Sequence, residues 1–204
     1  LRFGNLGRFR EPIERRVSAA IGRELNVNGS FALDLLPAPR LVAEDVTLAG
    51  AEWSDEPFMA RVGQLRLEVD LWSLLSPPVR VTNIEVRKAH IRLERDVEGR
   101  ANWGLELADR REETASRTRR DPPFILERAR LEEIELTYHE SSRQRPVRAA
   151  IERLDAGLDA RGLFAVDLVG EIDAAPVQLK GSITSLHRLL EGDPLVHELD
   201  GRLG

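Results

Sequence analysis

The segment Pro77-Pro78-Val79-Arg80-Val81-Thr82-Asn83-Ile84-Glu85-Val86-Arg87-Lys88-Ala89-His90-Ile91-Arg92-Leu93 carries the pattern that decides the fold of this 204-residue chain. The same spacing of prolines and apolar residues recurs 45 residues later, from Pro122 to Tyr138, and a weaker copy begins 38 residues upstream, at Pro39. Each copy reads as two short alternating strands after a proline-marked start. Such repetition predicts an array in which each unit buries its apolar side beside its neighbours.

Alternation of apolar and polar residues continues through most of the chain after Leu25, as in 64–71, 164–172 and 177–180. Residues 174–176, which do not alternate, separate the run 164–172 from the run 177–180. Short helical turns over 73–75 and 185–191 predict crossovers between strand groups. We count about eleven strands with one dry face and one wet face, which predicts an antiparallel, repeating sheet about 50 Å wide. Its dry face needs a cover, and the candidates are the curling of the sheet itself, a facing sheet or lipid.

The first 23 residues differ from the rest because arginine dominates them and their apolar residues follow helical spacing. Ile13, Val17 and Ile21 fall on one helical face, and Gly22 is expected to end the helix. This amphipathic helix has two compatible interpretations. It caps the end of the sheet, or it lies near an anionic membrane surface, where each arginine gains about 1 kcal/mol. The arginines concerned are Arg8, Arg10, Arg15 and Arg16.

Composition excludes several classes of function. A net charge of −5 and a pI of about 5.5 argue against a nucleic-acid partner. The chain has no cysteine, so disulfide and thiolate chemistry are excluded. Its four histidines lack zinc-site spacing, and there is neither a nucleophile elbow nor a phosphate-binding glycine loop. We therefore expect no catalytic residue, no metal and no cofactor, and a function other than catalysis.

Several stretches, taken in order, resemble one family. They are Gly22–Leu25, Asn28–Leu33, Pro39–Ala49, Glu52-Trp53, Met59–Gly63, Leu71–Leu75 and Gly99–Trp103. On these stretches the chain resembles the AsmA family, most clearly in Pro39–Ala49 and in the Gly-x-x-Asn-Trp sequence that ends at Trp103. The resemblance covers essentially the whole chain, more loosely after residue 121.

The resemblance implies an envelope protein of Gram-negative bacteria, with an inner-membrane helix followed by a β-rich periplasmic body. Larger members of the family form a long, curved β groove with an apolar floor, similar to chorein-type bridges that pass phospholipid between membranes. Other members are tied to outer-membrane protein assembly. Since Leu1 is not an initiator methionine, we expect the membrane anchor to lie before the present chain.

Together these observations predict a mainly β fold, a strongly curved antiparallel β-groove with an N-terminal amphipathic helix and short crossover helices. The expected parts are a membrane-proximal helix that caps the sheet (1–24), a first groove block (25–104), a charged flexible loop (105–121) and a second groove block (122–204).

Our leading hypothesis is that the groove binds or conducts phospholipid between the two membranes, with acyl chains on the concave face. The expected lining residues are Leu65, Leu67, Val69, Leu71, Ile84, Val86, Ile91, Leu93, Leu131, Leu136, Val166 and Leu168. The alternative is a non-enzymatic scaffold that closes its own core and docks an envelope protein through an edge strand or the charged loop.

Overall fold

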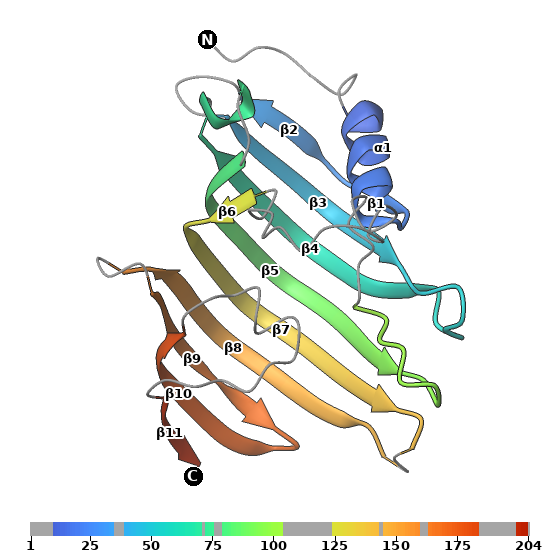
Figure 1. The fold of residues 1–204 in the computed structure, drawn as a ribbon, viewed down its shortest axis with the longest axis vertical. Coiled ribbons are helices and arrows are strands. Elements are labelled where there is room, and N and C mark those ends of the chain that lie inside the picture. Colours follow the sequence, from blue (N-terminus) through green and yellow to red (C-terminus); the bar gives the residue numbers. More distant parts are fainter. Residues whose placement is uncertain are drawn as a thin grey trace, which may run out of the picture.

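The described part of the chain forms a single open sheet with a helix at one edge (Figure 1). The structure is a computed structural model, and it describes residues 10–34, 39–70, 72–75, 79–103, 124–142, 145–159, 163–183 and 199–203. Within these ranges there are eleven strands, one α-helix and one 3₁₀ helix. The predicted mainly β fold and the predicted number of strands are confirmed.

The elements follow one another in this order: α1 (Arg10–Ile21), β1 (Leu25–Val27), β2 (Phe31–Asp34), β3 (Arg40–Ala49), β4 (Phe58–Val69), η2 (Trp72–Leu75), β5 (Val79–Arg95), β6 (Phe124–Leu126), β7 (Arg128–Glu140), β8 (Val147–Leu158), β9 (Phe164–Ile172), β10 (Ala175–Ile183) and β11 (Leu199–Leu203). The strand order across the sheet is β1-β3-β4-β5-β7-β8-β9-β10-β11, with β2 also paired to β3 and β6 also paired to β5. Neighbours in sequence are therefore mostly neighbours in space.

The sheet is mixed, so the prediction of a purely antiparallel sheet was wrong. Strand β5 pairs in parallel with both β6 and β7. The register of the parallel pair places Val79 beside Phe124 and Leu93 beside Tyr138, which is the 45-residue offset between the two sequence copies. Equivalent residues of the copies are thus direct neighbours. Alternation of apolar and polar residues looks the same in parallel and antiparallel strands, so it could not reveal this orientation.

The expectation of two short strands per copy was also wrong, because β5 is one continuous strand of 17 residues. The strand continues through both double steps of its apolar pattern. The step from Val81 to Ile84 contains a bulge against β4, whereas the step from Val86 to Ala89 leaves the register with β4 and β7 unchanged. Pairing with β4 shifts register opposite Val69, and Lys88 adopts a positive φ of 55°. Glu133 of β7 has φ 56° at the equivalent position, and Asp45 of β3 has φ 51°. The positive-φ residue of the first copy therefore lies 43 residues before Lys88, so an offset of 38 residues does not align the two positions.

Helix α1 lies along the outer edge of the sheet, beside β1 (Figure 1). The backbone N–H of Val27 donates to the Glu14 carboxylate at 2.7 Å, and the N–H of Leu25 donates to the Ser18 hydroxyl at 2.9 Å. These helix side chains satisfy donors that an edge strand would otherwise leave unpaired. Gly22, with φ 69°, follows the last helical residue, as expected.

A tight turn joins β9 to β10 where the sequence suggested an interruption over residues 174–176. Asp173 and Ala174 both have positive φ, 48° and 66°, which is the type I′ geometry that suits a two-residue hairpin. Pro176 then pairs with Glu171 inside β10. The strand begins at Ala175, not at Val177 as the sequence suggested.

Several expectations concern residues that the structure does not describe or features that it does not test. The charged loop at 105–121 and the helical turn at 185–191 lie outside the described residues, whereas the turn at 73–75 falls within η2. Strands from both expected groove blocks join in one sheet. The block boundaries and the strong curvature remain predictions.

Candidate functional site

One face of the sheet carries rows of apolar side chains that run across the strands. Residues paired directly across neighbouring strands point to the same side, so the register gives each row. The longest leucine-rich row crosses β3, β4, β5, β7, β8, β9 and β10, and its members are Ala43, Leu65, Val86, Leu131, Leu154, Leu168 and Leu179. No polar side chain interrupts it.

The rows on either side of the leucine row have the same character. Toward one end of the strands the members are Leu41, Leu67, Ile84, Ala129, Ala156, Val166 and Gly181. Toward the other end lie Val46, Val62, Ala89, Ile134, Ile151, Gly170 and Val177, and then Leu48, Ala60, Ile91, Leu136, Ala149, Ile172 and Ala175. We call these four rows the apolar face.

Three-residue steps at the same level of neighbouring strands keep the apolar face continuous. Between Val86 and Ala89 of β5, and between Leu131 and Ile134 of β7, one residue beyond strict alternation is added at a position of positive φ, Lys88 or Glu133, without any change of register between the strands. Without that residue, everything beyond it would turn to the opposite side of the sheet. The three-residue step in the sequence is thus the signal of one unbroken face.

Most large side chains of the apolar face are only half-buried. Buried hydrophobic residues among the described residues are few: Val27, Ala43, Val46, Met59, Ala89, Ile134, Ala156 and Phe164. Ile172 is 45% exposed and Leu158, near the end of β8, is 43% exposed. The described helices contact β1 and β5, and no second sheet is present within the described ranges. A core covered on both sides would bury these residues more deeply.

The structure brings the described residues of the predicted lining set together. Leu65, Val86, Leu131 and Leu168 share the leucine row, and Leu67, Ile84 and Val166 share the next. Ile91 pairs with Leu136, Leu93 with Tyr138, and Val69 with Val81. All are half-buried, whereas Leu71 lies outside the described residues. That they bind lipid remains a prediction.

Sequence reasoning missed several members of the apolar face. Leu154 and Leu179 complete the leucine row, and the small residues Ala129 and Ala156 lie side by side in the adjacent row. Their alternation was visible in the sequence, but only the strand register shows which residues are neighbours.

The opposite face is charged, and its charges pair across strands at directly opposed positions. Examples are Arg40–Glu68 at 2.6 Å, Arg66–Glu85 at 3.4 Å, Arg87–Glu132 at 2.6 Å, His90–Glu135 at 2.9 Å, Arg130–Asp155 at 2.7 Å and Lys180–Asp167 at 3.1 Å. Each exposed pair contributes little stability, about 0–1 kcal/mol. Together they give this face an alternating pattern of charge that favours contact with water.

A shallow hollow of about 430 Å³ lies among charged side chains where β4, β5 and β7 adjoin the β3–β4 turn. Its basic side chains have acidic partners, since the His90 imidazole contacts Glu135 and Arg92 contacts Glu56 at 3.4 Å. Arg61 stacks over the Phe58 ring at 4.5 Å. The described residues contain no cluster of three or more potential metal ligands.

The side chain of Asn102 stabilises the C-terminal end of β5 through two hydrogen bonds to its backbone. Its side chain accepts a hydrogen bond from the Glu94 N–H and donates one to the Arg92 carbonyl, both at 2.9 Å. Burial alone would raise the pKa of the Glu94 carboxyl, but hydrogen bonds from Ser54 and Arg92 outweigh it and lower that pKa. The Gly-x-x-Asn-Trp sequence therefore has a structural role.

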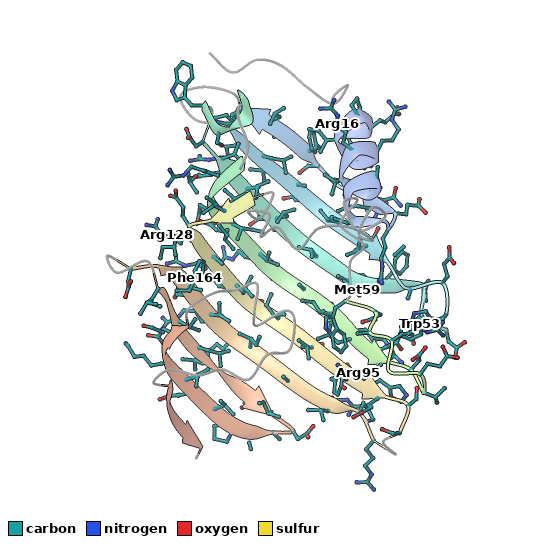
Figure 2. The ribbon with its side chains drawn as sticks, in the orientation of Figure 1. Arg16, Trp53, Met59, Arg95, Arg128 and Phe164 are labelled. Atoms are coloured by element: carbon teal, nitrogen blue, oxygen red, sulfur yellow. The ribbon has the colours of Figure 1, made fainter. Side chains whose placement is uncertain are left out.

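The basic residues expected near a membrane lie on α1 where they are described. Arg15 and Arg16 are exposed, and Figure 2 shows Arg16 on the helix at the edge of the sheet. Arg10 pairs with Glu14 at 3.1 Å, and Arg8 lies outside the described residues. Within the described ranges, no helix is both long and apolar enough to span a bilayer.

Comparison with known proteins gives one match. The model of the AsmA family matches residues 2–146, which is most of the chain. A search of curated proteins found no significant match.

Proposed function

Since this chain belongs to the AsmA family, we propose that its apolar face binds the acyl chains of phospholipid in the bacterial envelope. The proposal places the sheet in the periplasm, attached to the inner membrane by a segment outside this chain, where it supports envelope integrity by holding or passing lipid between the membranes. It requires no catalytic residue. The observation that carries it is an uninterrupted apolar face whose large side chains are only half-buried.

The dimensions of the apolar face suit an acyl chain. Seven strands at about 4.8 Å give a floor about 30 Å across. The hydrocarbon core of a bilayer is also about 30 Å thick and holds two chain lengths, so one chain needs about half of that distance. An extended acyl chain therefore fits on the floor, either across the strands or along them.

The energy of such contact favours lipids with two chains. A fully buried methylene contributes about 0.8 kcal/mol, so a methylene with one side on the floor contributes about half as much. Ten such methylenes contribute about 4 kcal/mol, which corresponds to millimolar affinity, and twice that number corresponds to micromolar affinity. We expect micromolar binding of phospholipid and much weaker binding of single-chain detergents.

The charged face explains how one sheet can bind lipid and stay in water. Its paired charges hold the outer side in solvent while the apolar side meets the acyl chains. Head groups would remain at the open rim, where water solvates them. Because contact with a flat apolar floor is non-directional, we expect weak selectivity between head groups.

Adjacent residues on opposite faces of β9 provide the test. Leu168 lies in the leucine row, whereas Val169 pairs with Arg153 in a charged row. The delipidated 204-residue chain, titrated with fluorescent phosphatidylethanolamine, should show saturable binding that Leu168→Ser weakens at least severalfold and Val169→Ser leaves unchanged. Absence of saturable binding by the folded wild-type chain would refute the proposal, as would equal effects of the two substitutions.

A further inference from the structure

Phe164 stands out on the apolar face because its aromatic side chain is almost fully buried on a sheet whose large side chains are mostly half-buried. It is 5% exposed, and its neighbour Ala156 is 8% exposed. Partly buried Leu126, Ala129 and Val166 pack against this pair. Figure 2 shows Phe164 at the start of β9, beside β8.

The ring is buried because the floor is lower at this point. Ala129 of β7 pairs with Ala156 of β8, and Ala156 pairs with Val166 of β9. In the adjacent row the corresponding residues are three leucines, Leu131, Leu154 and Leu168. Two alanines beside leucines leave a depression, and Phe164, two residues before Val166 on the same strand, points to the same side of the sheet and fills it.

Among the described residues, no second layer covers the depression. The direct cross-strand partner of Phe164 is Leu158, which is 43% exposed. A side chain at this position can therefore leave the depression by rotation about its χ1 bond without displacing a second layer of the described residues. The dry, alanine-floored space that it would vacate has the apolar lining that favours an acyl chain over water.

We propose that Phe164 is a reversible plug of the apolar face, an internal competitor that occupies the depression over Ala129 and Ala156 until an acyl chain displaces it. This inference rests on the proposed function, since it assumes that acyl chains bind the same face. It assigns Phe164 a role in setting lipid affinity, beyond packing. The plug keeps the lipid-free depression dry, and it lowers the affinity for the first lipid.

The experiment compares Phe164→Ala with Phe31→Ala. Phe31 is partly buried against the other cluster, around Ala43, and serves as the matched control. Binding of fluorescent phosphatidylethanolamine is measured for the 204-residue chain and both variants, together with circular dichroism and urea unfolding. We expect Phe164→Ala to bind about tenfold more tightly, which corresponds to roughly two additional methylenes fully buried in the vacated depression. Phe31→Ala should lose stability without any gain in affinity.

Phe164→Leu keeps more apolar volume, should fold even if the alanine variant does not, and should show an intermediate gain. Wild-type binding with no gain in either folded Phe164 variant would overturn the plug while leaving the proposed function intact. Binding by neither the wild type nor any folded variant would refute the proposed function and the plug with it. Binding only after Phe164 is shortened would refute the proposed function, which requires the wild-type chain to bind, and it would overturn the reversible plug as well, because no acyl chain would then displace the wild-type ring.

Discussion

Replacing Leu131 with aspartate tests whether the apolar face is open to solvent. Leu131 is half-buried, and its direct neighbours in the leucine row are Val86 and Leu154. Fully burying a leucine contributes about 1.5–3 kcal/mol, so losing a half-buried one should cost about 1–1.5 kcal/mol. On an open face the new carboxylate keeps its contact with water, and we expect a total loss of about 1–2 kcal/mol.

A closed core predicts a different magnitude. There the carboxylate would be buried without a partner, at a cost of several kcal/mol, and the domain would unfold or change its packing. Urea unfolding followed by circular dichroism distinguishes the two cases. With a slope of about 2–3 kcal/mol/M, the open face predicts that the midpoint falls by about 0.5 M.

Val169→Asp is the matched control for this substitution. Val169 lies in a charged row beside Arg153, so a carboxylate there should change stability by less than about 0.5 kcal/mol. On the open-face account, Leu131→Asp also lowers the affinity for phospholipid at least tenfold while the sheet stays folded. A loss of more than about 4 kcal/mol, or unfolding at neutral pH, would refute the idea that this face is open.

Four further substitutions, one of them a control, test the framework around the apolar face. A Cβ at Gly170 would lie 2.3 Å from the Ala150 carbonyl oxygen, so Gly170→Ala should lower the free energy of unfolding by about 1–3 kcal/mol. Gly157→Ala, whose nearest contact would be 3.5 Å, should change it little; equal effects would contradict the register between β8 and β9. Asn102→Ala should cost about 1–3 kcal/mol in urea unfolding, because two buried backbone groups lose their partner; a neutral result would contradict that bonding. The pKa of Glu94 lies below its ordinary 4.5, so the Glu94 carboxylate stabilises the fold above pH 4.5, and this contribution is lost as the pH falls through the lowered pKa. Glu94→Gln should therefore flatten the acid dependence of the thermal unfolding temperature. An unchanged pH profile would exclude a stabilising role for this carboxylate.

The sequence predicted the apolar face better than it predicted the sheet. Alternation in 64–71 and 84–93 identified which residues share a side, because side-chain direction in a strand has period two. The step from Val86 to Ala89 was visible too, but it was interpreted as the end of one strand and the start of another. A three-residue step inside one strand and a strand break leave the same sequence pattern, and only the backbone distinguishes them.

The parallel pairing and the neighbours across strands lay beyond a single sequence. The 45-residue repeat contained the register of β5 on β7, since equivalent residues of the two copies are paired. Its use would have required knowing that the copies lie side by side. Phe164 was missed for a related reason. Its burial depends on Ala129 and Ala156, which come from two other strands and of which Ala129 is far from it in the sequence.

Methyl NMR of the lipid-bound chain tests the central claim most directly. With methyl groups of leucine and valine labelled, the apolar face predicts NOEs between acyl-chain protons and Leu131, Leu154 and Leu168, and none to Val42 or Val169 on the charged face. Contacts confined to the charged face, or bound lipid that contacts neither face, would contradict it.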